Sequence, residues 1–285
     1  MNRRTLLAAV LALTLAPQTF AGTWLKNVDA AQKAAKAKNQ LILVDMFAEW
    51  CGWCHRFERE VFPSEAFQKA TSDIVLLRLD TEDGKEGTQL ARKYGVTSLP
   101  TFVLLTPDLE MAGQIRGYAP PPQFVKMLAE TRTKHEQFMV RVKNEKDLGK
   151  NWPARLQLAK DFTARSAFKE AEPRLRKLTT EKGIPAAIRD EAYYELALAH
   201  VLQGKYADAT KTIKELNGLS KLGESVERSR LLLGQIYMQQ GNLPAARDEF
   251  RSFKETFPNS PLIPNIDQVL PELEKRIGGR PSAGK

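Results

Sequence analysis

The only two cysteines of this 285-residue chain lie in the stretch Trp50-Cys51-Gly52-Trp53-Cys54-His55. Two cysteines separated by two residues can form a redox couple, half of a metal site, a haem attachment point or a plain disulfide. A disulfide between Cys51 and Cys54 would close a very small loop, so it would constrain the unfolded chain little. We therefore do not expect a purely stabilising role, and the surrounding sequence must decide among the other possibilities.

The N-terminus has the pattern of a secretory signal peptide. Arg3 and Arg4 precede an apolar run at residues 6–16, and small side chains occupy the first and third positions of residues 19–21. We expect residues 1–21 to be a signal peptide that is cleaved after Ala21, which would make the protein periplasmic or secreted. The apolar run is shorter than the ~20 residues of a membrane-spanning helix. No later segment is long and apolar enough either, so we expect no integral membrane protein after cleavage.

Charge distinguishes the two halves of the remaining chain. Residues 22–132 contain fourteen basic and fourteen acidic residues, whereas residues 133–285 contain 27 basic and 20 acidic residues. A basic surface can favour acidic partners, although it is more often a solvated helical face. No nucleic-acid recognition motif is present, so we expect no nucleic-acid partner.

Helix and strand patterns alternate through residues 22–132. Short apolar runs bounded by turn residues predict strands, and mixed polar and apolar segments between them predict helices. The predicted strands are residues 41–47, 74–79, 101–105 and 112–115, and the predicted helices are residues 29–38, 56–61, 90–94 and 121–132. Ser64 is expected to cap a further helical turn. This order predicts a mixed sheet that is covered by helices on both faces.

Two segments of this region resemble the thioredoxin family. Residues 43–54, LVDMFAEWCGWC, are similar to the family's active-site strand and turn. Residues 94–102, YGVTSLPTF, are similar to the family's segment with a cis-proline. The two segments lie in the family's order and at about its separation. The resemblance implies an α/β thioredoxin fold, with a mixed central sheet and flanking helices, for residues 22–132.

The resemblance also implies roles for the residues around the cysteines. Cys51 is expected to be the attacking thiol, because a helix start stabilises a thiolate. Cys54 is expected to resolve the mixed disulfide, and no cofactor is expected beyond the redox-active pair. The expected substrate-binding residues are Trp50, Gly52, Trp53, Leu99 and Pro100, with Gly52 permitting a tight turn and Pro100 in the cis form. Trp53 replaces the family's proline, so the reducing strength of thioredoxin is not carried over.

Asp45 matches the family's buried aspartate and is expected to accept a proton from Cys54. Burial in an apolar strand would raise the pKa of its carboxyl group. The family has a lysine partner for this aspartate, but Leu76 stands at the aligned position. We therefore expect proton transfer to use Glu49 or water instead, and His55 to modulate the charge near the cysteines.

Haem and zinc are the competing interpretations of the cysteine pair. Residues 51–55 fit the five-residue pattern of covalent haem attachment. The thioredoxin-like strand before the pair and Pro100 after it account for both cysteines without haem. A closed zinc site needs four ligands, and the chain has no second cysteine pair, so we expect no metal.

Residues 151–277 are almost entirely helical in pattern, and the pattern repeats. The most regular copy has Gly234, Tyr237, Gly241, Ala246, Phe250 and Pro258, at the spacings of a tetratricopeptide repeat. Earlier copies have Ala197, His200, Gly204, Ala209 and Ile213, and then Ala159, Phe162, Ser166, Ala171 and Leu175. We expect an all-α tetratricopeptide-like solenoid of three hairpins and a closing helix near residues 268–276. A helical linker at residues 133–150 would precede it, and a flexible tail at residues 278–285 would follow.

These features predict an exported protein thiol–disulfide oxidoreductase whose repeats bind a protein or peptide partner. Its substrates would be protein disulfides or dithiols, and a reductant in an oxidising compartment would need a membrane electron donor. Two alternatives stay open at this stage. One is an oxidant that donates disulfides, and the other is a non-enzymatic repeat-based adaptor or chaperone.

Overall fold

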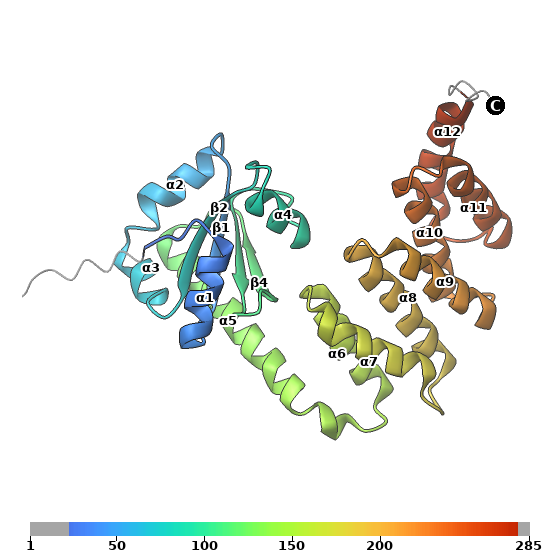
Figure 1. Cartoon of the computed structure of the whole chain (residues 1–285), viewed down its shortest axis with the longest axis horizontal. Coiled ribbons are helices and arrows are strands. Elements are labelled where there is room, and N and C mark those ends of the chain that lie inside the picture. Colours follow the sequence, from blue (N-terminus) through green and yellow to red (C-terminus); the bar gives the residue numbers. More distant parts are fainter. Residues whose placement is uncertain (1–22, 279–285) are drawn as a thin grey trace, which may run out of the picture.

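The computed structural model describes residues 23–278, which form a sheet domain (residues 23–132) and a helical domain (residues 145–278) (Figure 1). The long helix α5 (Pro121–Lys143) starts in the sheet domain and leads to the helical domain. The expected signal peptide and all but the first residue of the expected tail lie outside the described residues. Across residues 23–278, no helix has the length and apolar character needed to span a membrane.

The sheet domain contains a four-stranded mixed sheet in the order β2-β1-β3-β4. The strands are β1 (Ile42–Phe47), β2 (Val75–Asp80), β3 (Thr101–Leu105) and β4 (Met111–Arg116). Strand β1 is parallel to β2 and antiparallel to β3, and β3 is antiparallel to β4. The helices are α1 (Val28–Lys38), α2 (Gly52–Glu60), α3 (Glu65–Ala70), α4 (Glu86–Lys93) and the start of α5. The expected α/β fold is confirmed.

Helices cover both faces of the sheet, because side chains alternate along each strand. On one face, Leu43 and Phe102 pack with Phe57 of α2 and Phe124 of α5. The opposite face packs against α1, and its cluster includes Val28, Ala31, Ile42, Val44, Leu77 and Val103. Central strand β1 is therefore buried on both sides, which explains why its sequence is a nearly continuous apolar run.

The helical domain consists of three helical hairpins and a closing helix within residues 145–278. Its elements are η1 (Glu145–Leu148), α6 (Trp152–Ala164), α7 (Phe168–Thr180), α8 (Ala186–Leu202), α9 (Tyr206–Leu219), α10 (Glu224–Gln239), α11 (Leu243–Thr256) and α12 (Ile263–Gly278). The expected helix at residues 121–132 and most of the expected linker form one continuous helix, α5. The expected all-α architecture of this part of the chain is confirmed.

The turns inside the hairpins explain why the sequence repeats. Ser166, Gly204 and Gly241 lie between the paired helices and have φ angles of 57°, 72° and 73°. Side chains disfavour this left-handed region and glycine does not. The repeated position is therefore a conformational requirement of the turn, and the first hairpin meets it with a serine.

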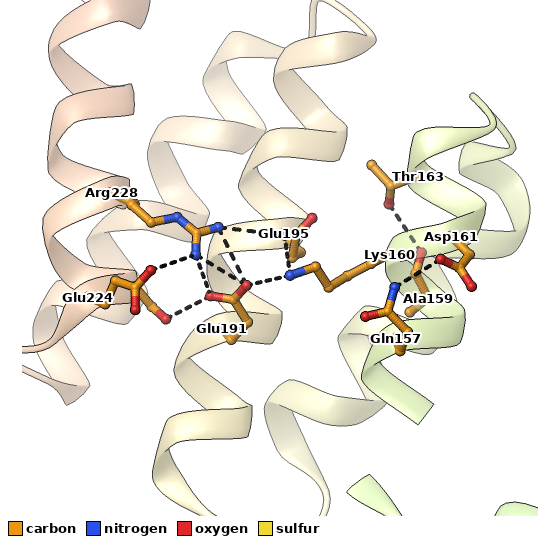
Figure 2. Close-up of polar contacts among 10 residues, drawn as sticks. Gln157, Ala159, Lys160, Asp161, Thr163, Glu191, Glu195, Glu224 and Arg228 are labelled. Atoms are coloured by element: carbon orange, nitrogen blue, oxygen red, sulfur yellow. Dashed lines mark hydrogen bonds and ion pairs between the residues drawn. The ribbon is translucent and has the colours of Figure 1, made fainter. Parts of the chain in front are cut away.

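The first helices of the three hairpins lie side by side and are joined by ion pairs (Figure 2). Lys160 of α6 contacts Glu191 and Glu195 of α8, with N–O distances of 2.7 and 3.2 Å. Arg228 of α10 contacts the same two carboxylates at 3.1 and 3.7 Å, and its guanidinium lies 3.9 Å from the ring centroid of Tyr194. The two cations share two carboxylates, and Arg228 also pairs with Glu224 at 3.7 Å, so the network links the three helices.

Gly234 provides a test of the repeat packing. A Cβ atom at this position would collide with the ring of Phe250 in the paired helix. We expect Gly234→Ala to lower the free energy of unfolding by about 1–3 kcal/mol, the usual cost of overpacking a core. Gly218→Ala in α9 is the matched control, because its Cβ would meet no atom within 4 Å. It should be neutral or stabilising by up to ~1 kcal/mol. Urea unfolding measures both variants, and equal stabilities would contradict the proposed close packing.

Candidate active site

The cysteine pair lies at the start of α2 and forms a disulfide. Cys51 is the N-cap residue and Cys54 lies in the first turn, with their Cα atoms 5.2 Å apart. The Cys51 sulfur accepts a hydrogen bond from the Cys54 N–H at 3.1 Å. Both cysteines are buried. In the reduced protein, the N–H groups and the dipole of this helix end would stabilise a thiolate at Cys51.

Asp45 is buried beneath the helix that carries the cysteines. Only 1% of its surface is exposed. It lies on the face of β1 that Leu43 shares, and that face packs against Phe57 of α2. Burial raises the pKa of the Asp45 carboxyl group to about 7, and the positive charge of Arg78 opposes this rise. A carboxyl group of this kind can gain or lose a proton near neutral pH.

Arg78 is the basic partner of Asp45, and it lies two residues beyond Leu76, which stands at the position of the family's lysine. The β1–β2 register places Arg78 directly opposite Asp45, whereas Leu76 lies opposite Leu43 in the apolar core. The Arg78 Nε lies 3.3 Å from the Asp45 Oδ2 in an ion pair. Within the described residues neither the Arg78 Nε nor the Asp45 Oδ1 makes a hydrogen bond. The contact therefore acts mainly through charge.

Glu58 extends this ion pair to the protein surface. It lies one turn after Cys54 on α2 and forms an ion pair with Arg78. Glu58 and Arg78 both line an open cavity of about 430 Å³, together with Lys26, Phe47, Glu49, His55, Asp80 and Asp83. The buried carboxyl group is therefore linked through one arginine to a surface that water reaches.

His55 and Glu49 lie at the mouth of this cavity. The His55 Nε2 is 2.8 Å from the backbone oxygen of Glu49, and its Nδ1 is 3.3 Å from a carboxylate oxygen of Glu58. The Glu49 side chain is exposed. Asp45 is thus linked to the surface through Arg78, which pairs with it, and through Glu58, which pairs with Arg78. The sequence did not single out either residue. The i, i+4 spacing of Cys54 and Glu58 on one helix face was the available signal.

Two exposed tryptophans flank the cysteine pair. Trp50 and Trp53 are 68% and 54% exposed. The Trp50 Nε1 donates a hydrogen bond to Glu82 at 2.9 Å, and the Trp53 ring lies 5.3 Å from the ring of Tyr118. Gly52 is the first residue of α2, and its φ angle is not in the left-handed region. The Cys54 N–H donates to the Cys51 backbone oxygen at 3.0 Å, so the chain turns tightly over residues 51–54 without a left-handed φ angle at Gly52.

Pro100 lies at the same end of the sheet as the cysteines. The Leu99–Pro100 bond is cis. Pro100 directly precedes Thr101, which lies opposite Met46 near the carboxyl end of β1. Pro100 is buried, and the Leu99 side chain packs against the core beneath α1 and α4. Leu99 thus contributes apolar packing, and any contact with a substrate would use its backbone.

No metal site accompanies these residues in the described part of the chain. Residues 23–278 contain no group of three or more His, Cys, Asp or Glu side chains that could hold a metal ion. The residues of the site instead combine a disulfide, a buried acid and an exposed aromatic rim. Chemically, this set can exchange disulfides and transfer protons.

The pKa of Asp45 predicts an unusual dependence of stability on pH. Between pH 4 and 7 the folded protein holds a proton on Asp45 that the unfolded chain has released, so stability falls as pH rises. We expect this group to remove roughly 4 kcal/mol of unfolding free energy between pH 4 and 8. Asp45→Asn should abolish that loss in urea titrations of the oxidised protein. Asp73→Asn is the control, because it removes only a surface ion pair with Arg132. The difference in unfolding free energy between this variant and the parent should stay constant from pH 5 to 8.

Arg78 should set the pKa of Asp45. Removing its charge in Arg78→Met should raise the Asp45 pKa above 7 by ~1 unit or more, because a nearby cation favours the ionised carboxylate. Carboxyl carbon NMR shifts followed against pH measure this value. Arg59→Met removes an exposed cation from the same helix region and should leave the Asp45 titration unchanged. A titration that is identical in the parent and in Arg78→Met would contradict the pairing.

Comparisons with known proteins agree with this geometry. Residues 28–132 match a family model described as a thioredoxin-like domain, and residues 228–260 match one described as a tetratricopeptide repeat. The thiol:disulfide interchange protein DsbD of Pasteurella multocida is 32% identical over 105 residues, which are 36% of this chain and 18% of that protein. The protein of the same name from Pseudomonas fluorescens is 32% identical over 109 residues, or 37% of this chain and 19% of that protein.

The matched region is one part of longer relatives. This chain spans about a fifth of the length of these curated proteins. A solved thioredoxin from Thermus thermophilus is 24% identical, with 40% of this chain and 90% of that chain covered and a TM-score of 0.36. The two family models identify residues 28–132 as a thioredoxin-like domain, with its cysteine pair at the start of α2, and residues 228–260 as a tetratricopeptide repeat.

Proposed function

We propose that this chain is an exported thiol–disulfide oxidoreductase that reduces or exchanges disulfides in a protein partner recruited by its repeats. The observation that carries the proposal is the Cys51–Cys54 disulfide at the start of α2, above the buried carboxyl group of Asp45. The similarity of a 105-residue stretch of this chain to a thiol:disulfide interchange protein supports it.

The reaction transfers two electrons from the dithiol to the substrate. The Cys51 thiolate attacks one sulfur of a substrate disulfide, and the first substrate sulfur leaves as a thiolate that takes up a proton. Cys54 then loses its proton and attacks the Cys51 sulfur in the mixed disulfide. The second substrate sulfur leaves as a thiolate, and the enzyme is left with the Cys51–Cys54 disulfide. The reverse sequence oxidises a substrate dithiol.

Asp45 is the proposed acceptor of the Cys54 proton. Its pKa of about 7 is much closer to the pKa of a thiol than the pKa of an ordinary aspartate is. Proton transfer between Cys54 and Asp45 therefore costs less free energy in either direction. Arg78 would stabilise the carboxylate that remains, and the cavity beside Glu58 would let the proton reach water. Asp45 would thereby couple the resolving step to solvent.

The exposed rim and the region near Pro100 are the proposed substrate surface. Trp50 and Trp53 offer flat apolar rings beside the cysteines. Leu99 makes no backbone hydrogen bond within the described residues, so its N–H and C=O groups can pair with an extended substrate strand. This arrangement would bring a substrate disulfide towards Cys51.

The helical domain is the proposed recruiting surface. Tetratricopeptide-like arrays present extended surfaces on which proteins bind. The ion pairs among Lys160, Glu191 and Arg228 hold the first helices in place (Figure 2), so the surface is preorganised. Reducing activity in an oxidising compartment would further require electrons from a membrane donor, and we include such a donor in the proposal.

The two cysteines should be distinguishable by substitution. Cys54→Ser should accumulate a mixed disulfide with the partner, because the attacking sulfur remains and the resolving one is absent. Cys51→Ser should form no such adduct, and both variants should lose turnover of oxidised glutathione. Non-reducing electrophoresis and mass spectrometry detect the adduct. Parent-like turnover in both variants would exclude the chemistry, and partner binding that ignores both substitutions would favour the adaptor alternative.

A further inference from the structure

The turn between α6 and α7 contacts the edge of the thioredoxin-like sheet. The Met111 N–H of β4 donates a hydrogen bond to the Arg165 backbone oxygen at 2.8 Å. The Arg165 Nη1 donates to the backbone oxygens of Met111 and Ala112 at 3.1 and 2.9 Å. In the next position, the Ser166 hydroxyl donates to the Lys93 oxygen of α4 at 3.3 Å. Two consecutive residues of one turn therefore make four hydrogen bonds across the domain boundary.

The Met111 N–H is a group of β4 that bonds outside the sheet. Strand β4 pairs only with β3, and an edge strand exposes a row of N–H and C=O groups. The Arg165 guanidinium also lies 4.0 Å from the centroid of the Phe138 ring in α5 and 3.3 Å from the Nδ1 of His135. Arg165 is therefore partly buried between the two domains, where it contacts both the sheet edge and the connecting helix α5.

The residues of this turn are those that depart from the repeat pattern. The corresponding turns contain Gln203-Gly204 and Gln240-Gly241, where the first hairpin has Arg165-Ser166. All three turns have a positive φ angle at the second position, so glycine would be the less strained choice for Ser166. Both departures supply side-chain donors that reach the sheet domain. These two departures of the first repeat are thus explained by contact with another domain.

The contact lies at the end of the sheet opposite to the cysteines. Met111 lies opposite Leu105, which lies opposite Ile42 at the start of β1. The cysteine pair follows the other end of β1. A substitution at Arg165 can therefore alter the domain arrangement without touching the residues of the active site.

We propose that Arg165 is a positioning residue that docks the repeats rigidly on β4, so that a recruited partner reaches Cys51 in a fixed orientation. The orientation of a partner rests on the proposed function, whereas the docking of the turn on β4 does not. Each hairpin packs against the next along the array. The docking of the first hairpin therefore fixes the orientation of the following ones.

Hydrogen exchange at the Met111 amide tests the docking in the full-length protein. In Arg165→Ala the turn loses the guanidinium bonds that hold it on β4, and we expect the Met111 N–H to exchange roughly 10-fold faster or more. Arg174→Ala is the matched control. Arg174 lies 4.4 Å from the Phe162 ring centroid and pairs with Glu145 and Glu170, all within the helical domain. It should leave Met111 exchange unchanged, and equal exchange in Arg165→Ala and the parent would overturn the docking.

Turnover measurements test the consequence for a partner. Oxidised glutathione serves as the small substrate, and the protein trapped by Cys54→Ser serves as the recruited one. We expect Arg165→Ala to keep the parent rate with glutathione and to lose roughly 10-fold in kcat/KM with the trapped protein. Arg165→Lys, which retains one donor, should recover part of that loss.

The outcomes separate this inference from the proposed function. Equal losses with both substrates, or no loss with the trapped protein, would overturn the positioning role of Arg165. A parent protein that fails to turn over glutathione would refute the proposed oxidoreductase, while Met111 exchange would still decide the docking. Small-angle scattering of the full chain is a second test of the docking. If the domains separate, the radius of gyration should increase in Arg165→Ala but not in Arg174→Ala, relative to the parent.

Discussion

The thioredoxin-like domain is organised around a carboxyl group that is buried in its central strand. A buried carboxylate without a partner would carry a large desolvation penalty, and Asp45 is almost completely enclosed. The parallel register places Arg78 beside it, and Arg78 is held in turn by Glu58 and by the Phe47 ring at 4.0 Å. One buried acid therefore constrains side chains on β1, β2 and α2. Because the compensation is incomplete, its pKa lies near neutrality, where proton transfer to or from a thiol is useful.

The sequence predicted the elements whose signals are local, and it missed the contacts that depend on register. The apolar run of β1, the helix start at the cysteines and the three repeat turns each follow from a few adjacent residues. Arg78 could not be found in this way, because the residue that lies opposite Asp45 depends on the register between β2 and β1. The aligned position, Leu76, lies two residues short and faces the apolar core instead. Glu58 was similarly recognisable as a neighbour of Cys54, but its role depends on where Arg78 lies.

Departures from a repeat are informative when the structure shows what they contact. Ser166 adopts a backbone conformation that glycine would adopt more easily, and Arg165 is partly buried between two domains. As a feature of an isolated hairpin, Ser166 would be an unfavourable choice. As contacts to β4 and α4, both supply hydrogen bonds to backbone oxygens of the sheet domain. These two departures thus have a physical cause, while ion pairs link α6, α8 and α10 within the array.

The sheet separates the two tasks that the proposed function combines. Its carboxyl end, where β1 leads to Cys51 and β3 begins after Pro100, leaves the tryptophan rim exposed to substrates. Its opposite end and its free edge bind the first hairpin, so docking does not cover the cysteines. If the repeats were docked at the carboxyl end, they would compete with the substrate for the same surface. Under the proposed function, docking at the far end would let the array hold a partner while the cysteines stay accessible, and the orientation of that partner would depend on one turn rather than on a flexible linker.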